Sequence, residues 1–233
     1  MIGAEILRHK ADIIILTEFY KTGDYRERLA RPLEESGYRV FEDPRPAKRG
    51  IRQVLIAVRA ERVGNPSVTP VLLPDNDGHV RTGHFPNFMR IDIGTDSGPV
   101  SVIGARIRVW TNHGAEEQLR RRNQFMTLLE HLPEDRPVVM AGDFNISDHP
   151  GFRKAGSRWH FDEDYRNVLD GRGFSLHIPD NGCSPIRSPY RMDHLVVSDH
   201  LAVDQVIYYA CDSWPVGEAN HPDHAILLAG VRI

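Results

Sequence analysis

The chain has 233 residues, of which 40% are hydrophobic, and its formal net charge is −3 at neutral pH. This balance indicates a globular protein with a sizeable core and excludes one that coats nucleic acid through bulk positive charge. Two cysteines in so long a chain do not make a disulfide framework, so we expect reduced thiols and a cytoplasmic location. We expect a single domain over residues 1–233, with no membrane-inserted segment, because no stretch has the composition of a linker or a membrane span.

The predicted elements begin with an amphipathic helix over Ile2–His9 and a buried strand over the continuous apolar run Ile13–Leu16. A second helix over Tyr25–Ser36 ends at Gly37. Short strands separated by proline, glycine, asparagine and aspartate follow at Tyr38–Phe41, Gln53–Val58, Val68–Leu72, Arg90–Ile93 and Val100–Ala105.

The clearest helix is predicted over Glu116–His131, which has a broad apolar face. The arginines of this helix, Arg120–Arg122, are interpreted as part of a solvated face paired with its glutamates. Three more strands are predicted at Pro137–Ala141, Leu195–Val197 and Ala225–Leu228. Many strands, few helices and mixed connections favour an α+β sandwich, with sheets packed together and helices outside.

Four short segments carry the candidate chemistry, and each lies beside an apolar, β-branched run. They are Thr17-Glu18, Gly142–Asn145, Arg191–His194 and Asp223-His224. Segments at strand ends are where α/β folds bring together catalytic groups from distant parts of the chain. The segments offer carboxylates for a hard divalent cation, an amide for an anionic oxygen and an imidazole that could activate water. Together they predict one site that cuts a phosphate ester.

The segment Gly-Asp-Phe-Asn follows a strongly apolar strand. Gly142 permits a sharp turn, and in an extended backbone Asp143 and Asn145 point to the same side, toward a common ligand. The alternative is an Asx-type turn that only caps the strand, since aspartate and asparagine favour such turns.

Two Asp-His pairs each open an apolar segment, at Asp193-His194 and at Asp223-His224. A carboxylate beside an imidazole raises its basicity and fixes its tautomer, as a general base requires. The alternative is that these Asp-His neighbours arise by chance, because the chain has 12 histidines. A zinc hydrolase using His194, His221 and His224 fits poorly, because the chain has no His-x-His or His-Glu-x-x-His spacing.

These four segments, in this order, resemble the endonuclease/exonuclease/phosphatase superfamily, the deoxyribonuclease I-like proteins. The resemblance runs from about residue 2 to the end of the chain. It implies a four-layer α/β sandwich, with two packed mixed β-sheets flanked by helices, and Mg²⁺ or Mn²⁺ as the cofactor. The resemblance implies a role for each residue: metal ligation by Glu18 and Asp223, positioning or activation of the attacking water by Asp143, phosphate binding by Asn145, orientation of the catalytic histidine by Asp193, and general-base catalysis or phosphate contact by His224.

The chain departs from this family pattern in two ways. Family members open with a strand that carries an asparagine near the metal, whereas here Met1 already lies in the predicted first helix. We therefore expect a domain that lacks the first strand, and either a natural polypeptide that begins upstream of Met1 or a reduced activity of this chain. Arg106 stands where a histidine or tyrosine is usual, which predicts electrostatic stabilisation of the phosphate in place of proton transfer. The alternative for Arg106 is an ordinary surface arginine.

The function predicted from the sequence is a divalent-metal-dependent phosphoesterase, with nucleic acid as the favoured phosphodiester substrate. One alternative is a binding module that kept the fold and lost efficient catalysis. Another is a phosphatase acting on small molecules or lipid head groups.

Overall fold

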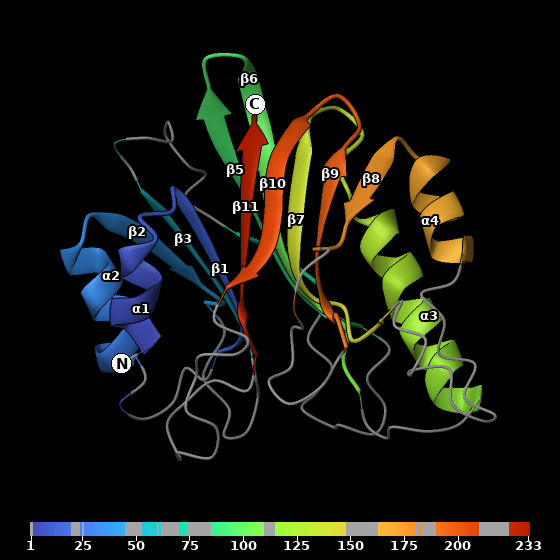
Figure 1. The fold of residues 1–233 in the computed structure, drawn as a ribbon, viewed down its shortest axis with the longest axis horizontal. Coiled ribbons are helices and arrows are strands. Elements are labelled where there is room, and N and C mark those ends of the chain that lie inside the picture. Colours follow the sequence, from blue (N-terminus) through green and yellow to red (C-terminus); the bar gives the residue numbers. More distant parts are fainter. Residues whose placement is uncertain are drawn as a thin grey trace.

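The computed structural model describes residues 2–19, 24, 26–44, 53–59, 61, 70–73, 85–109, 115–147, 163–179, 182, 190–209 and 224–233. These residues form an α+β sandwich with two layers of strands between two layers of helices (Figure 1). The predicted fold class is therefore confirmed.

The larger sheet has six strands in the order β4-β5-β6-β7-β9-β8. Neighbours are antiparallel except β6 and β7, which are parallel, so both of these strands end at the edge of the sheet where β9 begins. The strands are β4 (Val71–Leu72), β5 (Asn87–Thr95), β6 (Gly98–Arg106), β7 (Val138–Asp143), β8 (Phe174–His177) and β9 (Asp193–Ser198).

The second layer of strands contains two antiparallel groups. One has the order β1-β3-β2 and the other pairs β10 with β11. The bounds are β1 (Ile13–Phe19), β2 (Tyr38–Glu42), β3 (Gln53–Arg59), β10 (Ala202–Tyr209) and β11 (Ile226–Arg232). Strands of both groups pack against one core that they share with the six-stranded sheet.

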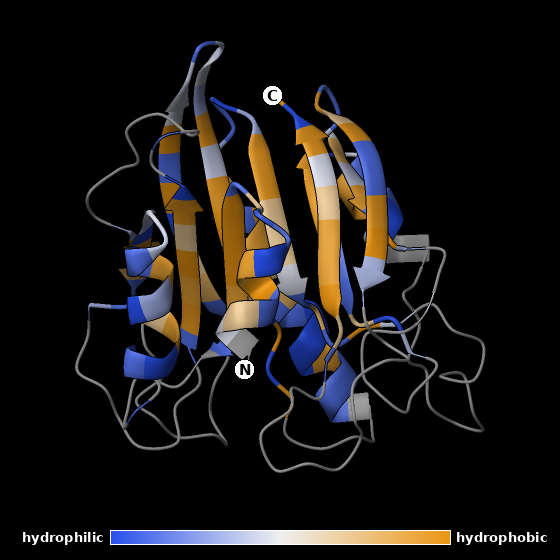
Figure 2. Ribbon diagram, turned by 60° about the vertical axis from the view of Figure 1, so that its left-hand side comes forward, coloured by the Kyte–Doolittle hydropathy of each residue, from blue (hydrophilic) through white to orange (hydrophobic). Residues whose placement is uncertain are grey.

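Helices cover the outer face of each layer. α1 (Ile2–Arg8) and α2 (Arg31–Glu35), the latter preceded by a π-helical turn over Arg26–Ala30, lie over the β1-β3-β2 group. α3 (Ala115–Glu130) and α4 (Glu163–Asp170) lie over the six-stranded sheet (Figure 1). Figure 2 shows hydrophobic residues running through the strands, while the helices combine hydrophobic and hydrophilic residues, as one-sided packing requires.

Three cores hold the layers together, one in each space between neighbouring layers. Ile6 and Leu33 pack under the first helices, Val102 and Val197 between the strand layers, and Phe125 between α3 and the larger sheet. The sheets approach closely at Gly104. A Cβ atom there would lie 2.3 Å from Val54 Cγ1, so only glycine fits at this crossing.

Each predicted strand overlaps an observed one, although Pro70, Pro137 and Ala225 lie just before the strands in which they were predicted. Positions 68–69 are outside the described residues. The predicted long helix corresponds to α3. Sequence reasoning missed α4, β8 and β10. β8 has only four residues, and the polar pair Asp204-Gln205 interrupts the apolar alternation of β10. None of the helices in the described part of the chain has the length and hydropathy that a bilayer crossing requires.

Candidate active site

Six of the predicted site residues lie in the described part of the chain, and all six meet at one edge of the sandwich. This is the lower edge in Figure 1, where β1, β6 and β7 end and β9 and β11 begin. The seventh, Asp223, lies outside the described residues. The six are Glu18, Arg106, Asp143, Asn145, Asp193 and His224.

Asp143, the last residue of β7, is the centre of the cluster. It pairs in register with Arg106 of β6 on one side and with Asp193 of β9 on the other. Residues paired in this way have Cβ atoms about 5 Å apart, so an arginine and a second carboxylate flank the Asp143 carboxylate. Main-chain bonds extend the ladder past the strand ends, from Ile107 N–H to the Asp143 carbonyl and from Phe144 N–H to the Met192 carbonyl, both at 2.9 Å.

Asn145 turns back onto Asp143. Its φ is +51°, and its main-chain N–H donates to Asp143 Oδ1 at 2.8 Å, which makes an Asx-type turn. The side-chain Nδ2 donates to Asp143 Oδ2 at 2.7 Å and to the Ile107 carbonyl at 2.9 Å. The turn that the sequence left as an alternative therefore exists, and it is what brings the two side chains together. Since both hydrogens of Nδ2 are used, contact of this group with a phosphate would require one of these bonds to open.

Glu18 reaches the cluster through a β-bulge. The pairing of β1 with β3 shifts between Leu16 and Phe19, and Glu18 has a φ of +60°. Such a bulge redirects a side chain at the end of a strand. The Glu18 carboxylate forms an ion pair with Arg106 Nη2, and Arg106 Nε lies 3.6 Å from Asp143 Oδ2. The Arg106 side chain is 12% exposed, so the alternative of an ordinary surface arginine is wrong.

Gly142 allows β1, β6 and β7 to converge. Its φ is +150°, and a Cβ atom would lie 1.9 Å from the Ala105 carbonyl oxygen and 3.1 Å from Thr17 Cγ2. The sequence predicted a glycine needed for a sharp turn. The structure adds a close contact that holds the strand bearing Glu18 beside the strand bearing Asp143.

His224 lies two residues before the start of β11, and its Nδ1 is 2.7 Å from Asp193 Oδ2. Asp193 is held in turn by β10, where the Tyr208 hydroxyl donates to the Asp193 carbonyl at 2.6 Å. The histidine 31 positions away along the chain, and not the adjacent one, is therefore the imidazole that contacts this carboxylate.

His194 points to the opposite face of β9 because successive side chains alternate along a strand. It is fully buried, packs against the Phe144 ring, and its Nε2 lies 2.7 Å from the Ile146 carbonyl. His194 therefore has a structural position that does not share the cluster with His224. This arrangement disfavours the zinc site considered from the sequence, whose third histidine, His221, lies outside the described residues.

The burial of Asp143 changes its chemistry. The residue is 3% exposed. Loss of solvent, together with the neighbouring Asp193 charge, raises the pKa of Asp143 to about 7, against the opposing effects of His224, Arg106 and the Asn145 hydrogen bond. A carboxyl with this pKa accepts and releases a proton near neutral pH.

The donors at this edge have the chemistry that Mg²⁺ or Mn²⁺ prefers, since carboxylate and amide oxygens are hard ligands. Glu18 fits such a role because its carboxylate is 25% exposed, and a bound cation would share this carboxylate with the Arg106 guanidinium or displace it. Within the described residues no three histidine, cysteine, aspartate or glutamate side chains are gathered as a metal centre would gather them. Asp223, the other expected ligand, lies outside these residues.

One feature of the site was missed from the sequence. Glu116 and Arg120 of α3 form the predicted solvated pair, but Glu117 and Arg121 are 2% and 5% exposed and lie against the site. The interpretation of Arg121 as part of a solvated face is therefore wrong. Residues three and four positions apart share a face of a helix, so the spacing of Glu117 and Arg121 to the apolar Phe125 could have indicated their burial.

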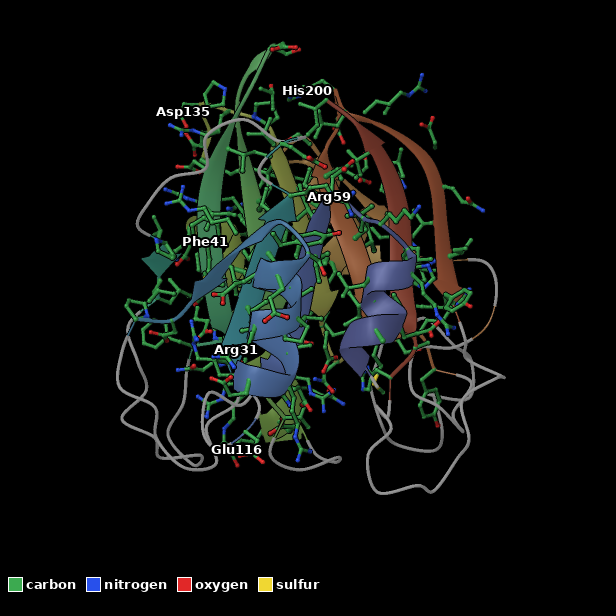
Figure 3. The ribbon with its side chains drawn as sticks, turned by 90° about the vertical axis from the view of Figure 1, so that its left-hand side faces the viewer. Arg31, Phe41, Arg59, Glu116, Asp135 and His200 are labelled. Atoms are coloured by element: carbon green, nitrogen blue, oxygen red, sulfur yellow. The ribbon has the colours of Figure 1, made fainter. Side chains whose placement is uncertain are left out.

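A separate cavity of about 630 Å³ lies at the other end of the sandwich, and none of the predicted site residues lines it. Its lining includes Asp135, Arg172 and His200. Figure 3 shows Asp135 and His200 at the end of the molecule opposite Glu116, which is near the start of α3.

Solved structures share this fold. An endonuclease/exonuclease/phosphatase from Beutenbergia cavernae DSM 12333 matches with a TM-score of 0.70 and 18% identity, covering 100% of this chain, which spans 65% of that one. D. rerio TDP2, complexed with a single-strand DNA product, matches with a TM-score of 0.66 and 14% identity. The match covers 100% of this chain and 90% of that one. The mannosyl-6-phosphatase Bt3783 of Bacteroides thetaiotaomicron VPI-5482 matches with a TM-score of 0.65 and 14% identity. The match covers 100% of this chain and 89% of that one.

The sequence itself matches no curated protein significantly. A family model, in contrast, covers most of it. The model describes the Endonuclease/Exonuclease/phosphatase family and matches residues 1–212, a span that contains five of the six described site residues. The chain belongs to the endonuclease/exonuclease/phosphatase family.

Proposed function

We propose that this protein is a divalent-metal-dependent phosphoesterase that hydrolyses a phosphate ester, with phosphodiesters of nucleic acid as the first substrate class. The observation that carries the proposal is the contact of Asp143 with Arg106 on one side and its pairing with Asp193, the partner of His224, on the other. Membership of a family of nucleases and phosphatases supports the same reaction class.

In this proposal Asp143 takes the proton of the attacking water. Its raised pKa, about 7, matches a general base that works near neutral pH. Asn145 holds both oxygens of the carboxylate through its main-chain and side-chain N–H groups, which fixes the direction from which Asp143 can reach the water.

Arg106 and His224 stabilise the negative charge of the phosphate. A guanidinium offers two parallel donors to a phosphate oxygen and stays charged through the reaction, which suits stabilisation and not proton transfer. Asp193 bonds His224 at Nδ1, so Nε2 is the nitrogen that would meet the phosphate or the leaving oxygen.

Glu18 and Asp223 would hold the Mg²⁺ or Mn²⁺. When bound, such an ion neutralises phosphate charge and lowers the pKa of water. The oxygen chemistry of Glu18 and its position beside Arg106 support this assignment.

A phosphatase acting on a sugar phosphate is the second candidate. It is favoured by the likeness to the mannosyl-6-phosphatase, which is as close in fold as the likeness to the DNA-bound protein. The fold alone does not choose between these substrates.

The test is a hydrolysis screen with single-stranded DNA, abasic duplex DNA, RNA, lipid head-group diesters and mannose 6-phosphate, each with Mg²⁺, Mn²⁺ or a chelator. We expect hydrolysis of at least one substrate that needs the metal and is abolished by Asp143→Asn. The matched control is Asp199→Asn, at the far end of β9, which should hydrolyse as the unchanged protein does. Binding of a nucleic acid without any hydrolysis would instead support the binding module.

A further inference from the structure

α3 carries two consecutive Glu–Arg pairs with the same spacing of four residues. The first, Glu116–Arg120, lies at the surface, with the Glu116 side chain 80% exposed and the Arg120 side chain 30% exposed. In the second, Arg121 Nε lies 3.5 Å from Glu117 Oε1, and both side chains are almost fully buried. The same type of ion pair thus occurs once at the surface of α3 and once in the interior.

The burial of an ion pair is weak evidence that the pair serves stability. Removal from water lowers the pKa of Arg121 to about 10, against the opposing charge of Glu117. Buried ion pairs are often no more stabilising than apolar residues of the same size, because desolvation offsets the attraction. The location of Glu117–Arg121 therefore calls for a different explanation.

Arg121 forms a hydrogen bond with the Asx-type turn that Asp143 and Asn145 make. Its Nη1 donates to the main-chain carbonyl of Asn145, the residue with φ of +51° that bonds both carboxylate oxygens of Asp143. Asparagine adopts the left-handed region more readily than other residues apart from glycine, because its side chain bonds locally, and further contacts help to hold it there. Arg121 supplies a charge-assisted bond at that point.

Gln124, one turn further along α3, acts on the neighbouring strand end. It is fully buried, accepts from the Arg108 main-chain N–H at 2.9 Å and donates to the Arg108 carbonyl at 3.0 Å. Arg108 follows Arg106 by two residues, and the Ile107 carbonyl between them accepts from Asn145. One face of α3 therefore forms hydrogen bonds with the main chain just beyond the ends of β6 and β7, the strands whose last residues are Arg106 and Asp143.

We infer that Glu117, Arg121 and Gln124 are positioning residues for the hydrolysis proposed above, on which this inference rests. They do not touch substrate. They hold the carboxyl ends of β6 and β7 so that the Arg106 guanidinium and the Asp143 carboxylate keep a fixed separation and direction. A displacement of about 1 Å in such groups can cost on the order of a hundredfold in rate.

The test compares Arg121→Met with Arg120→Met, the matched change on the solvent side of the same helix. We expect Arg121→Met to lower kcat at least about tenfold with KM nearly unchanged, at a temperature where the variant is fully folded. Arg121→Lys should recover part of the loss, because it restores the charge and one donor. Arg120→Met should behave as the unchanged protein.

A second readout does not depend on activity. Hydrogen exchange of the main-chain amide of Asn145, whose N–H donates to Asp143, should become at least about tenfold faster in Arg121→Met. The main-chain amide of Val102, in the core between the strand layers, should keep its protection. This measurement distinguishes the two proposals. Should the unchanged protein hydrolyse no substrate, the proposed function fails, and the exchange rate still shows whether Arg121 holds the turn.

Arg121→Met leaves Glu117 as an uncompensated buried charge and so could unfold the protein. The double variant Glu117→Leu/Arg121→Met removes both charges and keeps the volume, so it should fold. A positioning role predicts the same loss of kcat and the same faster Asn145 exchange in the double variant. Unchanged kcat and Asn145 exchange in a folded double variant would overturn the inference.

Discussion

Asp143 and Asp193 occupy directly opposed positions on β7 and β9, so that two carboxylates face each other across one rung of the sheet. Like charges in this arrangement repel, and the repulsion adds to burial in raising the pKa of Asp143 to about 7. Arg106 on the neighbouring strand and His224 on Asp193 offset it with positive charge. In this part of the site two carboxyl groups are balanced by a guanidinium and an imidazole, and the contribution of each group can be tested.

The pH dependence of stability should report Asp143. Its pKa when folded, about 7, is above its ordinary value of 3.8, so the folded protein binds this proton more tightly than the unfolded chain does. The resulting contribution is complete below about pH 4 and is lost as the pH rises through 7. In Asp143→Asn, which stays neutral, this loss should be missing. Urea unfolding from pH 4 to pH 8, with a chelator present, measures this loss as a change in the free energy of unfolding. If the free energy of unfolding changes with pH in the same way in both proteins, the raised pKa of Asp143 is contradicted.

Asp193→Asn should lower turnover by about a hundredfold or more, the range usual for acid–base groups. The amide keeps a similar shape but no longer carries the charge that orients His224 and supports its protonated form. Turnover and its pH profile measure the change, with Asp199→Asn as the control at the other end of β9. If the profile and turnover of Asp193→Asn match those of the control, Asp193 has no part in the mechanism.

Substitution of Arg106 should separate charge from geometry. Arg106→Lys keeps the positive charge beside Glu18 and Asp143 and loses the fork of donors, so kcat/KM should fall about tenfold. Arg106→Gln loses the charge as well, and a fall of about a hundredfold or more is expected. Arg136→Gln removes an arginine at the far end of the sandwich and serves as the control. Equal activity of Arg106→Gln and the control would exclude a catalytic role for Arg106.

Gly142→Ala should destabilise the fold by about 2 kcal/mol or more, because its Cβ would lie 1.9 Å from the Ala105 carbonyl oxygen. Gly98→Ala is the matched control, since Gly98 also has positive φ, +118°, but nothing lies within 4 Å of the added Cβ. Its cost should be the backbone cost alone, on the order of 1–3 kcal/mol, without the clash that Gly142→Ala adds. The free energies of unfolding of the two variants decide the point, and equal values would mean that contact at Gly142 is not limiting.

The sequence alone was sufficient for the positions of most strands along the chain, the long helix α3 and the positions of the site residues near strand ends. These features depend on local patterns, because a buried strand such as β7 needs a continuous apolar run and a polar residue that ends it stands out. Elements without such a pattern were missed. β10 carries Asp204 and Gln205 in its middle and owes its place to pairing with β11.

Only the tertiary structure explains which partners the site residues take. Glu116–Arg120 and Glu117–Arg121 have the same spacing in the sequence, yet packing of α3 against β7 buries the second pair and leaves the first at the surface. The resemblance to the family implied that Asp193 orients His224, and the structure gives the physical reason: alternation along β9 turns the adjacent His194 into the core, while β11 brings His224 to the edge. Local sequence sets backbone periodicity, but contacts between side chains far apart in the chain depend on how the layers pack.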